Sequence, residues 1–430
     1  MYMRINVQFG QPLERGDSME FALCGLSALS VLRELRRRGI LDVANAKRVN
    51  LSAPILAETG RKSRAAMVRF LEGYPCIAGF SSEHPLQIAV PSAKDRPRIK
   101  AVSCTVHSGG LPEGAFMGIG DGLTMSSPEL LFVELANVMS PEVHLLLGME
   151  LCGTFARDPV DPRNGAVAYQ VPAVTSVQRL RAFVEACWHV NGLGKARETL
   201  EWLVDNAWSP MEAILAALSV LPGAMLGYDL WPVQLNRRID MEEGASKQSR
   251  VPDLLFCGTE VGMNYDGEDH LPLRDIASAA MRLALSPGSS DKQKELENAI
   301  AVARAESVSD KRRDRDLGAA GMTVFAVTKE DLYEERGLDK LMLQVIEAIE
   351  RGGRRKLTKQ RVMLENPLLA SLRQEFIWSL LPGKTGVEAG RRLKERLEPK
   401  GHPVMHTATY ADGHFIEHEM RELGLDEVYI

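Results

Sequence analysis

The sequence predicts an α/β protein of the α+β type, in which a mixed α/β N-terminal region is joined through a helical linker to a C-terminal domain with a central mixed sheet. Segments with the period-two alternation of strands and segments with helical spacing occur in both halves of the chain. Ser-Pro pairs at Ser127, Ser140 and Ser209 are typical of helix starts, because serine caps exposed amides and proline suits the first turn. Residues 209–350 follow the order helix, three strands, helices, strand and helix.

The composition is ordinary for a globular protein, with 430 residues, 45% of them hydrophobic and 25% charged. This length suits roughly two or three domains. The net charge of -5 does not indicate nucleic-acid binding by the chain as a whole, so any such surface must be local. No secretion signal or membrane-spanning stretch is found, and the six scattered cysteines favour reduced thiols. We therefore expect a cytoplasmic protein with no membrane partner.

A first domain is expected at residues 1–153. Its predicted elements are helices at 25–38, 130–138 and 143–151 and strands at 86–90 and 101–106. Residues 153–174 are rich in Pro, Asp and Gly, which is typical of a linker. A helical hairpin follows, and we assign linker and hairpin together to residues 154–208.

A second domain is expected at residues 209–350. Its predicted elements are a helix at 211–220, strands at 235–240, 251–257 and 261–266, a helix at 310–320, a strand at 322–327 and a helix at 338–349. The helical segment 271–308 interrupts this order and is interpreted as an insert. Residues 351–430 are expected to be a basic linker and a polar tail.

Acidic residues occur in two of the predicted neighbouring strands. Asp253 lies in the first, and Asp266 ends the second with Asn264 on the same face. If Asp253 faces the same way, the two carboxylates could share a cation about 4–5 Å apart across the strands. The favoured cation is Mg²⁺, which prefers oxygen ligands and can lower the pKa of an attacking water. Asn264 could add a carbonyl oxygen to this metal site, but it adds no charge.

Two interpretations of these acids remain open. Glu260, Glu268 or Asp269 could supply the charge that Asn264 lacks, and His270 could act as a general base or bind phosphate. Alternatively, the fold is retained without an active site, the acids cap turns, and His270 is a surface histidine. The sequence therefore leaves open whether this set is catalytic.

Local basic segments are the candidate nucleic-acid contacts. The candidate residues are Arg312, Arg313, Arg354, Arg355 and Lys356. The first two open the predicted helix at 310–320, and the others belong to the basic run 351–361, which contains no acidic residue. Such residues can bind phosphates. Their alternatives are a solvated helix face with internal charge pairs and a hydrophilic linker.

The C-terminal tail is rich in histidine over residues 402–418. Residues 414–418 match the His-x-x-Glu-His pattern of some zinc proteases. Too few residues follow this pattern to supply a distant third ligand, so a polar tail helix is favoured over a metal site.

Four motifs occur in order along residues 209–350. They are Pro252-Asp253, Asn264-Tyr265-Asp266-Gly267, His270, and Asp310-Lys311-Arg312-Arg313 before the strand at 322–327. Together with the order of elements, they resemble the Vsr-like branch of the restriction-endonuclease-like PD-(D/E)XK fold. Glu212 matches the acidic residue that this family often carries in its first helix.

The resemblance implies a Mg²⁺-dependent phosphodiesterase that acts through Asp253 and Asp266, with Glu212 and His270 as helpers. The chain departs from the family pattern in two places. Asn264 stands where the family has a strand glutamate, so the set of acids implied for catalysis is incomplete. The insert 271–308 lengthens the connection after His270 but leaves the order of elements implied for the fold unchanged.

The N-terminal half carries a second set of motifs. They are Ser27-Ala28-Leu29, the strand-like Leu86–Pro91 region, the Gly120-Asp121-Gly122 turn and Ser127-Pro128-Glu129. Over residues 20–150 they resemble the AbiEi family, antitoxin-repressors of abortive-infection toxin–antitoxin systems. The resemblance implies a cognate toxin and DNA as partners, although the winged helix-turn-helix that usually precedes this region is not found.

We therefore expect a bacterial, DNA-associated protein of a defence or toxin–antitoxin system, with a nuclease-like domain that uses Mg²⁺. The alternative is a non-catalytic antitoxin or transcriptional regulator that binds a partner toxin or DNA. A structural interaction module without a nucleic-acid role is a third candidate.

Overall fold

The computed structural model describes residues 19–397, except 42, 44, 57–60, 121, 231, 238–251, 267–272, 287 and 354. The chain divides into two compact units between Ala213 and Ile214, within α8. Both units contain helices packed on mixed sheets, so the predicted mixed α/β class is confirmed. Residues 154–208 belong to the N-terminal unit by this division.

The N-terminal unit is built on a mixed six-stranded sheet with the order β2-β5-β6-β1-β3-β4. Its strands are β1 (Phe21–Leu23), β2 (Arg48–Val49), β3 (Leu86–Val90), β4 (Val102–Val106), β5 (Phe116–Gly120) and β6 (Leu123–Ser126), with a separate pair β7 (Phe155–Ala156) and β8 (Ala168–Tyr169). Its helices are α1 (Gly25–Arg37), α2 (Arg61–Phe70), α3 (Pro75–Ala78), η1 (Ala93–Asp95), α4 (Pro128–Leu135), α5 (Pro141–Leu151), α6 (Val177–Ala186) and α7 (Leu193–Leu200). The helices and strands predicted for this region are all present.

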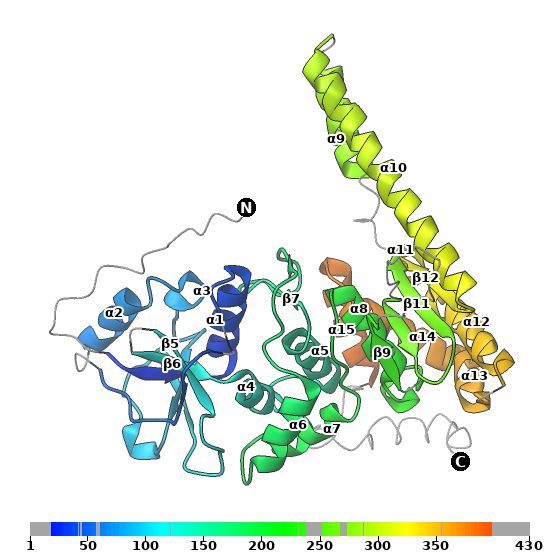
Figure 1. Cartoon of the computed structure of the whole chain (residues 1–430). Coiled ribbons are helices and arrows are strands. Elements are labelled where there is room, and N and C mark those ends of the chain that lie inside the picture. Colours follow the sequence, from blue (N-terminus) through cyan, green and yellow to red (C-terminus); the bar gives the residue numbers. More distant parts are fainter. Residues whose placement is uncertain are drawn as a thin grey trace. The chain divides into compact units, whose positions relative to one another are not determined.

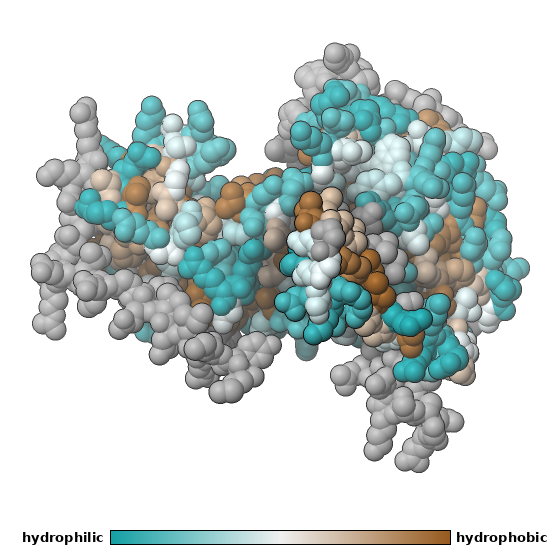
Figure 2. Space-filling model, turned by 90° about the horizontal axis from the view of Figure 1, so that it is seen from above, coloured by the Kyte–Doolittle hydropathy of each residue, from teal (hydrophilic) through white to brown (hydrophobic). Residues whose placement is uncertain are grey.

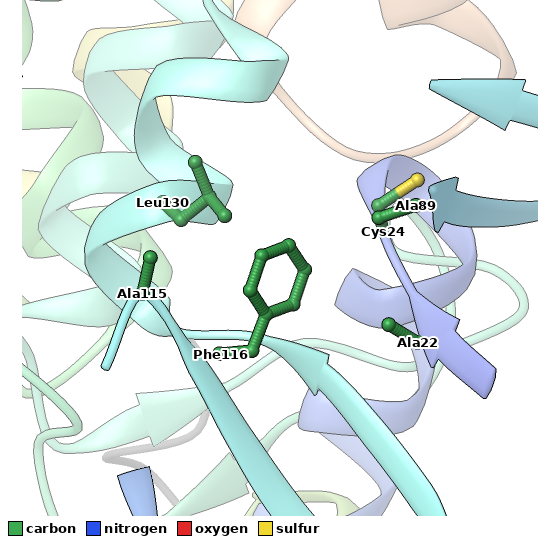
Figure 3. Packing of buried hydrophobic residues seen from close by; sticks show 6 residues of the cluster. All are labelled: Ala22, Cys24, Ala89, Ala115, Phe116 and Leu130. Carbon is green, nitrogen blue, oxygen red and sulfur yellow. The ribbon is translucent and has the colours of Figure 1, made fainter. Parts of the chain in front are cut away.

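The core of this unit lies between the sheet and its helices. The ring of Phe116 on β5 lies between Leu130 of α4 and Cys24 at the start of α1 (Figure 3). Ala22 of β1 and Ala89 of β3 join the buried cluster on the same side as Cys24, and Ala115 joins it on the side of Leu130 (Figure 3). Because small and large apolar side chains alternate here, α1 and α4 can pack closely on the sheet.

Two of the predicted serine caps, Ser127 and Ser140, make different contacts in the structure. Ser127 accepts a hydrogen bond from the backbone N–H of Leu130 at 3.2 Å and caps α4 as expected. Ser140 stands at the N-terminus of α5 but makes no such bond to the backbone. Its hydroxyl instead donates to the Glu142 carboxylate two residues later. The same Ser-Pro-Glu pattern therefore supports a helix start in both places by different contacts.

The segment 153–174, expected to be a linker, is held within the N-terminal unit. Arg36 of α1 is 3% exposed and donates to the backbone carbonyls of Glu150, Gly153 and Pro172 at 3.0, 2.9 and 3.0 Å. Irregular backbone must find donors for its carbonyls, and a guanidinium supplies several at once. The Pro- and Gly-rich composition therefore indicated irregular backbone here, but not a free connection.

The C-terminal unit is built on a mixed four-stranded sheet with the order β12-β11-β10-β9. Its strands are β9 (Val233–Leu235), β10 (Leu254–Phe256), β11 (Val261–Asp266) and β12 (Thr323–Thr328). Its helices are α8 (Pro210–Val220), η2 (Gly223–Met225), α9 (Leu273–Ala284), α10 (Ser290–Ala319), α11 (Lys329–Tyr333), α12 (Gly337–Arg351), α13 (Thr358–Glu365), α14 (Pro367–Leu380) and α15 (Lys384–Leu397). β9, β10 and β11 are antiparallel neighbours, and β12 is parallel to β11. The predicted order of helix, three strands, helices and strand is confirmed.

The segment 271–308 is helical as expected, but it does not form a separate insert. α10 continues without a break from Ser290 to Ala319 and therefore includes the helix predicted at 310–320. No glycine or proline interrupts it before Gly318, so nothing in the chain favours an end within it. α9 lies along α10, and α10 packs against β12 near its C-terminal end (Figure 1).

The region 351–430, expected to be a basic linker and polar tail, forms α13, α14 and α15 as far as residue 397. Arg373 of α14 is buried and donates to both carboxylate oxygens of Asp339 on α12 at 3.0 Å. The hydroxyl of Tyr228 donates to the same carboxylate at 2.9 Å, and the Arg373 guanidinium lies over the Tyr228 ring. This buried group ties α14 to α12 and to the segment around Tyr228. The histidine-rich segment 402–418 lies outside the described residues.

One face of the described part of the chain is largely polar (Figure 2). Hydrophilic side chains are widespread on the face shown in Figure 2, with smaller apolar patches between them. None of the described helices has the length and apolar character needed to cross a membrane. The six cysteines are free thiols.

Candidate functional site

The candidate site is one edge of the four-stranded sheet in the C-terminal unit. Parallel β11 and β12 end there, with Asp266 opposite Thr328 in the register. Antiparallel β10 begins at the same edge, directly after Asp253. The structure therefore places Asp253 and Asp266, the two proposed metal ligands, at the same sheet edge.

Two hydrogen bonds between side chain and backbone join Asp253 to Asn264 and Tyr265 of β11. The backbone N–H of Asp253 donates to Oδ1 of Asn264 at 3.0 Å. The backbone N–H of Tyr265 donates to Oδ2 of Asp253 at 2.7 Å. We call this reciprocal pair the 253–264 clamp. It fixes the start of β10 against β11 and orients the Asp253 carboxylate.

The register makes Asn264, and not Asp266, the direct neighbour of Asp253. Leu254 pairs with Met263, so one further step places Asp253 opposite Asn264. Asp266 is then a diagonal neighbour of Asp253, and such residues are about 7–8 Å apart. The expected direct approach of the two carboxylates across the strands is therefore replaced by a wider diagonal arrangement.

Exposure also separates the three residues. Asn264 is 3% exposed, Asp253 is half-buried, and Asp266 is exposed. An amide that is buried and already accepts the Asp253 N–H has a structural role. A solvated cation at this edge would therefore meet Asp266 and Asp253 rather than Asn264.

Glu260 does not supply the missing charge at this edge. It precedes β11, whereas Asp266 ends that strand. Six residues of extended chain span about 20 Å, so Glu260 lies at the opposite edge of the sheet. The other candidates, Glu268, Asp269 and His270, lie outside the described residues. Within the part of the chain that is described, no group of three or more His, Cys, Asp or Glu side chains is arranged to hold a metal ion.

Glu212 has a capping role at the start of α8. Its Oε2 accepts from the backbone N–H of Trp208 at 2.9 Å, and its own backbone N–H donates to the Ser209 hydroxyl at 3.1 Å. The side chain is 8% exposed. This is the arrangement of a helix N-terminus stabilised by serine and glutamate.

The candidate basic residues differ in how available they are. Arg312 on α10 is exposed and has no ion pair with another described residue. Arg313, its neighbour, is half-buried and engages another group of the chain. Of the two, Arg312 is therefore the better placed to contact a phosphate.

The basic run 351–361 is partly neutralised within the C-terminal unit. Arg361 pairs with Glu350 at 2.7 Å, and Lys359 lies 3.6 Å from Asp229. Arg355 is half-buried and also engages another group, whereas Lys356 is exposed. Arg354 lies outside the described residues. The run therefore offers fewer free cations than its sequence indicates.

Sequence reasoning missed the backbone N–H of Tyr265, which orients Asp253. No residue type could have marked it, because every residue except proline carries this donor. Comparison with protein-family models, curated proteins and solved structures finds no match to the chain. The case for a function therefore depends on the sheet edge and on the exposed cations.

Proposed function

We propose that this chain is a nucleic-acid-associated protein of a bacterial defence or toxin–antitoxin system, with a restriction-endonuclease-like C-terminal domain. The observation that carries the proposal is that Asp253 and Asp266 lie at the same edge of the sheet, as diagonal neighbours. The order α8, β9–β11, α10 and β12 around a mixed sheet supports it, because the resembling nuclease fold has this order. The first candidate activity is Mg²⁺-dependent hydrolysis of phosphodiesters.

The donor chemistry of this edge fits Mg²⁺. This cation is commonly held by one or two carboxylates and keeps several waters, so Asp253 and Asp266 would suffice as protein ligands. Bound Mg²⁺ would polarise a phosphate and favour a deprotonated water. The Tyr265 N–H holds one oxygen of Asp253, which restricts how that carboxylate can turn. Arg312 and Lys356, both exposed, would contact the nucleic-acid backbone.

The 253–264 clamp favours a second candidate function, that of a non-catalytic antitoxin or regulator. In the resembling nucleases the position of Asn264 carries a glutamate that serves the metal. Here the side chain is buried and its oxygen accepts the Asp253 N–H. On this interpretation the scaffold of a nuclease is kept for binding a toxin or DNA, and it does not cut.

Cleavage assays separate the two candidates. Supercoiled plasmid and single-stranded DNA are incubated with the full chain and Mg²⁺ or Mn²⁺, and compared with Asp253→Asn and Asp266→Asn. Asparagine at 253 keeps an acceptor for the Tyr265 N–H while removing the charge. If the first candidate is right, each variant lowers the cleavage rate about a hundredfold or more, because the bound metal stabilises the charge that develops in the transition state by several kcal/mol. Asp314→Asn, an exposed acid on α10, is the matched control and keeps the rate.

The absence of cutting by the unaltered chain with either metal excludes the first candidate. Cutting that persists in both Asp253→Asn and Asp266→Asn also excludes it, because it then comes from elsewhere. Unchanged DNA binding in EDTA by all three variants, without cutting, supports the second candidate.

A further inference from the structure

The N-terminal unit contains an open surface cavity of about 560 Å³ between α2 and the connection from β3 to β4. Three cations line it, Arg64 from α2 and Arg98 and Lys100 from the connection. Ser81 and Ser82, which precede β3, add hydroxyl groups. None of the described residues that line the cavity is acidic. Cations from two segments therefore meet at one hollow without internal neutralisation.

The three cations differ in their contacts with the rest of the chain. Arg64 donates to the carbonyl of Phe80 at 2.9 Å and lies over the Phe80 ring. This contact uses one donor of the guanidinium and leaves the others available. Arg98 and Lys100 are exposed and have no hydrogen bond or ion pair with the rest of the described chain. Two cations that have no partner among the described residues thus border the cavity, beside Arg64, whose guanidinium contacts Phe80.

The other lining residues suit a nucleotide. The Ser81 hydroxyl accepts from the backbone N–H groups of Glu83 and His84 at 3.3 and 3.2 Å, so its own proton remains free to be donated. Ile99 and Ala101 give the cavity an apolar part. A phosphate at the cationic side would leave a sugar or base against this apolar part.

We propose that this cavity binds the phosphate of a nucleotide, with Arg64, Arg98 and Lys100 as its phosphate-binding residues. Guanidinium and ammonium groups form charge-assisted hydrogen bonds to phosphate, and the volume lies within the range of about 300–1,000 Å³ found for small-ligand sites. The nucleotide is either free or part of a nucleic-acid strand. The cavity lies in the other unit from Asp253 and needs no metal, so this site and the proposed cleavage can fail separately.

Binding is measured with the full chain in EDTA. Titration calorimetry compares adenosine 5′-monophosphate with adenosine, and fluorescence anisotropy follows a labelled 20-nucleotide oligothymidine across salt concentrations. The test variant is Arg98→Ala with Lys100→Ala, both exposed and without partners among the described residues, so the fold is retained. The matched control is Lys94→Ala with Arg96→Ala. These are exposed cations of the same connection that do not line the cavity, and they remove the same charge.

For a free nucleotide, the unaltered chain binds the monophosphate in preference to adenosine. The test variant weakens this binding at least about tenfold, and the control changes it less than about threefold. If the ligand is a nucleic-acid strand, the test variant weakens oligonucleotide binding and the control variant does not. The test variant also lowers the slope of log affinity against log salt by about 1.4, the value for two lost phosphate contacts on a single strand.

Three results overturn the proposal. The first is that neither the monophosphate nor the oligonucleotide binds. The second is that adenosine alone binds as well as its monophosphate while the oligonucleotide does not bind. The third is that the test and control variants weaken binding equally, which would reduce the effect to overall charge. Asp253→Asn is expected to leave all of these affinities unchanged.

Discussion

At the scale of single residues, Asn264 has a role that its partners determine. Its amide oxygen accepts the backbone N–H of Asp253, and the side chain is 3% exposed. The alternation of β11 could be predicted from the sequence, and so could the shared face of Asn264 and Asp266. The partner of Asn264 could not, because it depends on the register between two strands.

Replacing Asn264 by alanine tests the clamp. The part-buried backbone N–H of Asp253 then loses its acceptor, so we expect the free energy of unfolding of the C-terminal unit to fall by about 1–3 kcal/mol. Urea denaturation followed by circular dichroism measures this change. Asn50→Ala is the control, because Asn50 accepts the Gly114 N–H at 3.0 Å on an exposed site. This substitution should change the free energy of unfolding of the N-terminal unit by less than about 0.5 kcal/mol. Equal costs for the two variants would contradict the structural role of Asn264.

His144 predicts a pH dependence in the N-terminal unit. Burial lowers the pKa of His144 to about 4 from 6.5, and its Nε2 donates to the Phe132 carbonyl at 2.7 Å. The unfolded chain takes up a proton near pH 6.5, whereas the folded chain does so only near pH 4. Stability is therefore present above pH 6.5 and is lost as the pH falls towards 4, by about 2 kcal/mol between pH 7 and pH 5.

Urea midpoints at pH 7 and pH 5 measure this loss. His144→Gln should remove most of the difference between the two midpoints, whatever its effect on stability at pH 7. His84→Gln, at an exposed histidine, should retain it. A His144→Gln variant with the full pH dependence would show that other groups cause it.

At the scale of elements, helix and strand types followed from the sequence more closely than their limits did. The absence of glycine and proline along most of α10 favours one unbroken helix, whereas the order of motifs predicted an insert followed by a second helix. The division followed the motif order and not the local propensity. The basic run before them and the polar segment after them suggested a linker and tail instead of α13, α14 and α15, whereas α14 packs through buried residues such as Leu369 and Phe376.

The N-terminal and C-terminal halves of α10 should differ in their contribution to stability. Leu317 near its C-terminus is fully buried, whereas Ile300 is 47% exposed. We expect Leu317→Ala to cost about 2–5 kcal/mol, since it leaves a cavity, and Ile300→Ala to cost less than about 0.5 kcal/mol. Thermal and urea denaturation of the two variants provide the comparison. If Ile300→Ala costs as much as Leu317→Ala, another surface covers that part of the helix.

At the scale of the whole molecule, each unit contains its own buried ion pair. Arg33 and Glu150 are 2.6 Å apart in the N-terminal unit, and Arg373 and Asp339 are 3.0 Å apart in the C-terminal unit. Burial raises the pKa of Glu150, but the net shift is downward because the charges and hydrogen bonds of Arg33 and Arg157 together outweigh burial. Such pairs form from residues far apart in sequence, so composition does not reveal them.

Breaking these pairs tests the division into units. We expect calorimetry of the full chain to resolve two transitions, one for each unit. Glu150→Gln should lower only one of them and Asp339→Asn only the other, because losing one partner of a buried pair costs about 3–5 kcal/mol in its own unit. A single transition that both variants lower equally would contradict independent units.

The sequence by itself determined the mixed α/β class, the order of elements from α8 to β12 and the association of Asp253 and Asp266 with successive strands. These follow from local periodicity and from residue preferences at turns and caps. The tertiary structure alone decided that Asn264 accepts the Asp253 N–H, that Arg36 holds segment 153–174, and that Arg64 joins Arg98 and Lys100 at one cavity. Register and packing bring these groups together across long sequence separations, and no local pattern carries that information.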